Sequence, residues 1–131
     1  MPSIFSKIIS GEIPCYKVAE NDEFLAFLDI MPLRLGHVLV IPKRETDYIF
    51  DIADDELSRF MVFSKYVAQG IKKIVPCKKI GVTVIGLEVP HAHIHLVPID
   101  SVADMNFAAE KQQVDPQTLS ELAMKIAEVL K

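Results

Sequence analysis

Three histidines stand at alternate positions in the stretch VPHAHIHLVPID, residues 89–100. They are His91, His93 and His95, and the whole chain has only four histidines. Side chains of a β-strand point alternately to its two faces, so a strand over 89–99 would carry all three rings on one face. The other face would be apolar and buried, since it carries Ala92, Ile94 and Leu96.

Such a row of imidazoles can be explained in three ways. Structural histidines are the ordinary explanation for a single ring, but a row of three adds little to the stability of a strand. A metal site is a minor alternative, because the outer two Cα atoms lie about 13 Å apart at roughly 3.3 Å per residue, too far to converge on one tetrahedral ion. Two of the rings with a carboxylate or with His37 could still form one. Nucleophilic and acid–base catalysis on an anionic group is the third and favoured explanation, because neutral imidazole attacks phosphorus and a strand fixes each ring relative to the next.

The elements that must position these rings follow from hydrophobic periodicity and turn residues. A short helix is expected within 4–14, and an amphipathic helix is expected over 54–75, with acidic residues at its start and lysines near its end. A terminal helix should begin at Asp115 and Pro116 as its N-cap and first residue. Strands are predicted over 15–22, 23–30, 36–42, 78–85 and 89–99. Residues 101–114 look irregular.

This pattern predicts one α+β domain over residues 1–131, with a five-stranded, mostly antiparallel meander and the helices packed on one face. The net charge of −4 argues against a surface that binds nucleic acid. No apolar run is long enough for a membrane span, and the N-terminus lacks the pattern of a secretory signal. Cys15 and Cys77 are expected as free thiols, although a disulfide between them stays open. A cytoplasmic protein is therefore expected.

Two motifs together resemble the histidine triad (HIT) family of nucleotide hydrolases and transferases. HAHIHLV is similar to the family's signature of three histidines separated by hydrophobic residues, and GHVLVIPK is similar to its fourth-histidine element. The segments IFSKIISGEIP and FLAFLDIMPLRLGHVLVIPK extend the similarity over most of the chain.

The resemblance implies a role for each histidine. His93 matches the nucleophile that attacks the α-phosphorus and becomes nucleotidylated. His95 matches the histidine that contacts the phosphate and assists the leaving group. His91 matches the one that supports the nucleophile through hydrogen bonding, and His37 matches the fourth histidine in the neighbouring strand.

The resemblance also implies a nucleotide pocket. Asp29 stands where the family has an acid that binds the ribose hydroxyls; a turn residue is the alternative, and the intact motif around Asp29 favours the ribose role. Phe5, Ile8, Phe27 and Ile30 stand where the family lines a base pocket, and each could instead be plain core.

Several positions near the expected phosphate depart from the family pattern. Leu87 stands where many relatives carry glutamine, Thr83 is the nearest match to an asparagine, and Glu88 replaces a serine. These changes remove polar groups and add a carboxylate that could repel a phosphate. Ser3 and Ser6 stand where some relatives carry the two cysteines of a zinc site, so that site is expected to be absent.

The resulting hypothesis is a purine nucleotide hydrolase that releases AMP, similar to the Hint-like nucleoside phosphoramidase branch. Its substrate would be an adenosine phosphoramidate or an aminoacyl-adenylate, and it would need neither a metal nor another cofactor. A dinucleoside polyphosphate hydrolase is one alternative. A nucleotide-binding regulatory protein with weak catalysis is another, favoured by Leu87 and Glu88, and a zinc hydrolase is a third. A homodimer is expected, because the family commonly pairs its protomers and the 54–75 helix carries surplus bulky apolar residues.

Overall fold

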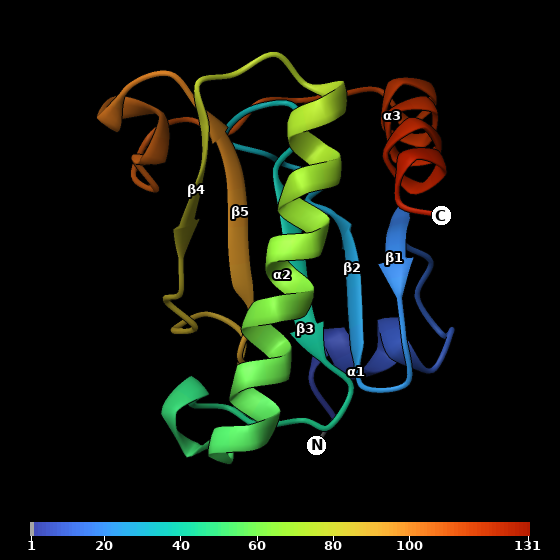
Figure 1. Cartoon of the computed structure of the whole chain (residues 1–131), viewed down its shortest axis with the longest axis vertical. Helices are drawn as coiled ribbons and strands as arrows, with labels where there is room; N and C mark the ends of the chain where they lie inside the picture. The colour runs from blue at the N-terminus through green and yellow to red at the C-terminus, as the bar shows by residue number, and fades with distance from the viewer. Residues whose placement is uncertain (1) are drawn as a thin grey trace.

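A computed structural model describes residues 2–131 as an antiparallel sheet with helices on both faces (Figure 1). The strands are β1 (Lys17–Glu20), β2 (Phe24–Leu28), β3 (Val38–Pro42), β4 (Lys79–Thr83) and β5 (Ile94–Ile99). They lie in the order β1-β2-β3-β5-β4, and every neighbouring pair is antiparallel. The predicted α+β class and five-stranded sheet are confirmed. The order departs from a simple meander only in that β5 inserts between β3 and β4, which leaves β4 as an edge strand.

The helices are α1 (Ile4–Ile9), α2 (Asp54–Ile74) and α3 (Pro116–Val129), with short 3-10 turns η1 (Ile49–Asp51) and η2 (Val102–Met105). The predicted start of α3 is confirmed, because the Asp115 carboxylate caps the helix by accepting from the Thr118 N–H at 3.1 Å. The two 3-10 turns were not predicted; η2 falls in the segment expected to be irregular.

The helices cover both faces of the sheet, so the expectation that they share one face is wrong for α1. One core lies between the sheet and α2 and α3, and it includes Phe24, Phe60, Ile71, Ile94 and Ile126. A second, smaller core lies on the opposite face, where α1 packs Phe5 on Leu25, Phe27, Leu39 and Ile41. The reason is visible in β2, whose five residues FLAFL are all buried. A short strand that is apolar at every position is typical of a strand covered on both sides.

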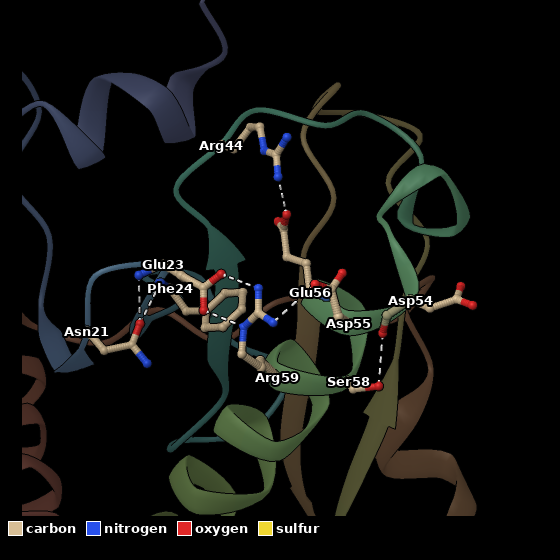
Figure 2. Close-up of polar contacts among 9 residues, drawn as sticks. All are labelled: Asn21, Glu23, Phe24, Arg44, Asp54, Asp55, Glu56, Ser58 and Arg59. Atoms are coloured by element: carbon tan, nitrogen blue, oxygen red, sulfur yellow. Dashed lines mark hydrogen bonds and ion pairs between the residues drawn. The ribbon is translucent and has the colours of Figure 1, made fainter.

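Ionic contacts hold the start of α2 to the β1–β2 hairpin and to the segment that follows β3 (Figure 2). Arg59 donates to both carboxylate oxygens of Glu23, at 2.7 and 2.8 Å. The Asn21 side chain accepts from the backbone N–H groups of Glu23 and Phe24, which fixes the turn. Arg44 pairs with Glu56 in the first turn of the helix. Together these contacts fix α2 over one face and leave the opposite face for α1 and the histidines.

Two further expectations concern membrane-spanning helices and the cysteines. No helix within residues 2–131 has both the length and the apolar character needed to cross a membrane. Cys15 and Cys77 are free cysteines, as predicted.

Candidate active site

The three alternating histidines converge, although the strand that carries them is shorter than predicted. β5 begins at Ile94, so His95 lies in the strand while His91 and His93 precede it. The β3–β5 ladder ends at Val40 and Ile94 because β3 runs on to Pro42, which has no N–H to donate. The Ala92 N–H donates instead to the Thr46 carbonyl at 2.6 Å.

The alternation still gathers the rings on the face covered by α1. The ring centroids of His93 and His95 are 4.8 Å apart, and Phe5 contacts both His91 and His93 edge-on at 5.8 and 4.9 Å. The residues that alternate with the histidines, Ala92, Ile94 and Leu96, are buried in the core under α2, as predicted.

His93 is held by the backbone of the residue two positions earlier. Its Nδ1 atom lies 2.8 Å from the His91 carbonyl oxygen, which can only accept a hydrogen bond. Nδ1 therefore carries the proton of the neutral ring, and Nε2 carries the lone pair. His93 lines a cavity of about 320 Å³ together with His95. Its free lone pair is the property that a nucleophile needs.

His37 and His95 form a buried, directed pair. The Leu33 N–H donates to His37 Nδ1 at 3.2 Å, so the proton of neutral His37 is on Nε2. His37 Nε2 lies 3.0 Å from His95 Nδ1 and donates to it. The proton of His95 is consequently on Nε2, as a hydrogen-bond donor on the ring edge away from His37.

Both rings of this pair are neutral at neutral pH. Burial, followed by the positive charge of Lys111, lowers the pKa of His37 to about 4. Burial and the neighbouring His37 lower the pKa of His95 to about 3. A neutral pair keeps the directed pattern of donors and acceptors, because a second proton on His37 would have to displace the Leu33 hydrogen bond.

His91 is anchored by residues from two other elements. Its Nε2 donates to the Pro42 carbonyl at 2.7 Å, and its Nδ1 accepts from the Ser3 hydroxyl at 2.9 Å. The Glu45 carboxylate in turn accepts from the Ser3 N–H and the Ser6 hydroxyl, at 2.6 and 2.7 Å. These bonds lower the pKa of Glu45 to about 2. His91, whose carbonyl orients His93, is therefore hydrogen-bonded to Ser3, the N-cap of α1.

Asp29 lies beside His37, in the cavity that the histidines line. One of its carboxylate oxygens accepts from the Met31 N–H at 2.9 Å, and the other lies 3.8 Å from His37 Nε2. Burial raises its pKa. Asp29 lines the same cavity as His93 and His95, so the structure brings the predicted acid to the predicted histidines.

The expected base-pocket residues divide into two groups. Phe5 and Phe27 are buried and meet edge-to-face at 5.8 Å, and Ile8 packs against the same small core. Ile30 is 62% exposed and does not join them. The structure therefore brings three of the four residues together, and Phe5 connects this group to His93.

The residues that depart from the family pattern lie at the mouth of the cavity or close to it. Leu87 and Glu88 line it, and Leu87 is 88% exposed. Thr83 is the last residue of β4 and pairs in register with His95. Leu87 and Glu88 offer no side-chain donor to an anion.

Sequence reasoning missed several residues that contact the histidines or line their cavity, among them Ser3, Glu45, Phe107 and Lys111. Phe107 packs edge-on against His95 with ring centroids 4.8 Å apart. Nothing in the local sequence around Glu45, Phe107 or Lys111 signals this placement. The serine of SIFS, preceding a helical stripe, was a detectable helix cap, but its bond to His91 was not predictable.

A group able to hold a metal ion also occurs here. Asp29, His37 and His95 each offer a ligand atom, all within 4.8 Å of one another. This is the combination of two imidazoles and a carboxylate that the sequence left open. Both nitrogens of His37 are already engaged, with Leu33 and with His95, so a metal bound to His37 would replace one of those hydrogen bonds. That no metal is needed stays a prediction.

The fold and the site define a class of protein with a four-histidine centre on an antiparallel sheet, and comparison with known proteins identifies the family. The HIT domain family model matches residues 10–102, and the chain belongs to that family. A HIT-like protein of Borreliella burgdorferi is 35% identical over 95% of each chain. The adenosine 5′-monophosphoramidase of Schizosaccharomyces pombe is 36% identical over 75% of this chain and 74% of its own.

A solved structure shares the fold over almost the whole chain. It is the crystal structure of a HIT-like protein involved in cell-cycle regulation from Bartonella henselae, with an unknown ligand. The TM-score is 0.82 at 31% identity, over 96% of this chain and 95% of that one. The resemblance seen in the sequence is confirmed.

Proposed function

We propose that this protein is a nucleotide hydrolase that cleaves a nucleoside 5′-monophosphate amide or ester through a nucleotidyl intermediate on His93. The observation that carries the proposal is the pair of assigned tautomers: His93 has its lone pair on Nε2, and His95 has its proton on Nε2. A nucleophile and a hydrogen-bond donor thus stand side by side, with ring centroids 4.8 Å apart. The activity named for the fission-yeast relative is of this reaction class.

The first step forms one bond and breaks another. His93 Nε2 attacks the α-phosphorus, and a phosphorus–nitrogen bond to the ring forms as the bond to the leaving group breaks. The leaving amine or oxygen accepts a hydrogen bond from His95 Nε2–H and takes up its proton from solvent water, so His95 stays neutral. The His91 carbonyl stabilises the positive charge that develops on His93, because it accepts the hydrogen bond from Nδ1.

The second step returns the enzyme to its starting state. Water attacks the same phosphorus as the bond to His93 breaks, and the proton of that water passes to solvent, while His95 Nε2–H donates a hydrogen bond to a phosphoryl oxygen. The products are the nucleoside monophosphate and free His93. In both steps the Leu33 N–H and His37 fix the orientation of His95.

The proposed nucleotide contacts lie in the histidine cavity and in the small apolar core beside it. Asp29 is proposed to bind the ribose hydroxyls, because its carboxylate is positioned by the Met31 N–H and faces the cavity. Phe5, Phe27 and Ile8 are proposed to pack beside the purine. Ile30 would join them only if its exposed side chain turned onto the base.

One observation keeps a second candidate open, a nucleotide-binding regulatory protein with weak catalysis. Glu88 and Asp29 put two carboxylates at the cavity, and Leu87 replaces a polar residue there. Steady-state rates on an adenosine phosphoramidate, an aminoacyl-adenylate and a dinucleoside polyphosphate separate this candidate from the hydrolase. Rates near background on all three, with AMP still bound, support the regulatory protein.

We also propose that two copies pair through the edge strand β4 and the neighbouring face of α2. Phe60 and Phe63 are buried within one protomer, so they do not supply this surface. Met61 and Val82 are 45% and 53% exposed, and β4 is an edge strand with no neighbouring strand on its outer side. Sedimentation at micromolar concentration is expected to show a dimer, and a single 14.7 kDa species would contradict it.

The proposed reaction is tested by trapping its intermediate. Enzyme mixed with an adenosine phosphoramidate labelled at the α-phosphorus and quenched in base should carry label on His93, located by peptide mass spectrometry. Parallel reactions after chelator treatment should turn over at the untreated rate. Turnover without label on His93 would contradict the covalent route, and loss of activity restored by zinc would support the metal site at Asp29, His37 and His95.

A further inference from the structure

The segment between η2 and α3 forms one wall of the active-site cavity. It crosses the end of the sheet from β5 toward α3 (Figure 1). The Gln112 N–H donates to the Pro32 carbonyl at 3.0 Å, which fixes the segment against the loop before β3. The Phe107 ring contacts His95 at 4.8 Å and His37 at 6.2 Å. Residues 106–112 are therefore built into the site.

Lys111 is the cation that this segment brings to the cavity. Its Nζ donates to the Phe107 carbonyl at 2.9 Å and lies 5.7 Å from the centre of the Phe107 ring. It lines the cavity with Asp29, His93 and His95. An ammonium group has three N–H donors, so the bond to a neutral carbonyl leaves two for a ligand. The Phe107 carbonyl and ring thus aim a partly free ammonium group at the site.

A phosphate in this cavity needs such a cation. The other charged lining residues, Asp29 and Glu88, are acidic, and both repel an anion. His37 and His95 are neutral at neutral pH, because burial holds their pKa values low. Among the described residues that line the cavity, Lys111 is the only lysine or arginine. Without it the phosphate would meet two negative charges and no fixed positive one.

We propose that Lys111 binds the non-bridging phosphoryl oxygens of the nucleotide, and that the segment 106–112 is the phosphate-binding wall of the site. The proposal rests on the proposed nucleotide-hydrolase function, and it adds to the histidine centre a binding group from outside the residues 10–102 that the family model matches. Lys111 offsets the charge of Glu88, and it holds the phosphate where His93 and His95 can reach it.

The experiment separates phosphate binding from ribose and base binding. Isothermal titration measures the dissociation constants of AMP and of adenosine for the wild type, Lys111→Gln, Lys111→Arg and a control, Lys125→Gln. Lys125 is exposed on α3, which packs under the opposite face of the sheet. Lys111→Gln should weaken AMP binding about tenfold or more, because it removes a charge-assisted hydrogen bond. Adenosine binding should stay within about twofold, and Lys111→Arg should recover most of the AMP affinity.

Salt dependence and turnover add two independent readouts. The AMP dissociation constant of the wild type should rise with salt more steeply than that of Lys111→Gln, since one ion pair is missing from the variant. On the phosphoramidate, Lys111→Gln should raise KM by a factor similar to the loss in AMP affinity. Lys125→Gln should match the wild type in every measurement.

Each other outcome overturns the proposal in a distinguishable way. Equal AMP affinity for the wild type and Lys111→Gln, with normal wild-type turnover, would show that Lys111 does not bind phosphate while the nucleotide function stands. An equal loss for AMP and adenosine in both Lys111 variants would make Lys111 a support for Asp29 or for the segment. Failure of the wild type to bind AMP or to turn over any nucleotide would overturn the proposed function, and this inference with it.

Discussion

Around the start of α2 charged side chains pair at the surface, whereas beside β5 the pair His37 and His95 consists of neutral rings inside the molecule. Arg59 and Glu23 are both well exposed, and each can exchange its partner for water (Figure 2). His37 and His95 are 1% and 8% exposed, and each ring nitrogen between them has a single assigned role. The comparison teaches that geometry alone does not rank polar contacts. Burial determines how much free energy of unfolding is lost when a polar contact is broken. The assignment of donor and acceptor determines whether the contact can take part in a reaction.

The largest effect is expected from His93→Asn, which removes the nucleophilic nitrogen. Turnover of an adenosine phosphoramidate should fall by on the order of 10⁴-fold or more, because no other group can form the covalent bond. AMP binding should stay within about tenfold, since Asp29, Phe5 and Phe27 are unchanged. Steady-state kinetics and calorimetry measure the two quantities. A variant that keeps more than a few per cent of wild-type kcat would rule out His93 as the nucleophile.

A smaller loss is expected from His95→Asn, which removes the ring that assists the leaving group and keeps the nucleophile. Turnover should fall by about 10²–10³-fold, the usual cost of losing one oriented hydrogen-bond donor to developing charge. The loss should shrink for substrates whose leaving group departs without assistance, such as an activated phenol ester. A loss of the same size on both kinds of substrate would count against a role of His95 at the leaving group.

The buried pair should also make stability depend on pH. The folded-state pKa values of His37 and His95, about 4 and about 3, lie below the ordinary value of 6.5. Between pH 6.5 and 4 the unfolded chain binds more protons than the folded one, so the free energy of unfolding falls as pH falls. The slope is at most about 1.4 kcal/mol per pH unit for each ring.

Urea denaturation of the wild type and His95→Asn at several pH values measures this contribution. Exposed carboxylates add their own pH dependence to both proteins, so the difference between the two curves isolates the histidine. The variant should lose less stability between pH 6.5 and 4.5 than the wild type. Parallel curves would show that His95 does not stay neutral in the folded protein.

The smallest effects are expected at the surface, where two exposed arginines offer a matched pair. Arg44 pairs with Glu56, whose side chain is 8% exposed, while Arg59 pairs with the exposed Glu23. Arg44→Met should lower the free energy of unfolding by about 1–3 kcal/mol, because it leaves a buried carboxylate without its partner. Arg59→Met should lower the melting temperature only slightly, and less still at high salt. Equal losses in the two variants would contradict the role given to burial.

The sequence predicted the positions of the helices and strands better than it predicted which face of the sheet each helix covers. Helical and strand periods located α2, β2 and β3 to within a few residues, since each depends on its own apolar pattern. The face covered by α1 depends on which alternate residues of β2 meet Phe5, and a strand that is apolar at every position gives no local sign of this.

Part of the site was predictable for a different reason. The alternate spacing singled out His91, His93 and His95, and the GHVLVIPK motif singled out His37. Their proximity in the structure could therefore be predicted. Lys111 reaches the cavity through an irregular segment with no period. Its place depends on the docking of residues 106–112 against Pro32, a contact that no pattern in the chain encodes.

The bond between Ser3 and His91 has a consequence for the order in which the protein folds. It joins positions 88 residues apart, and the bond between His37 and His95 joins positions 58 apart. The chain must close long loops before either contact can form, whereas the β1–β2 hairpin and α2 form from neighbouring residues. During refolding, regained activity should therefore lag behind regained helical signal. The candidate site is completed only when the N-terminal segment has reached the segment that carries His91, His93 and His95.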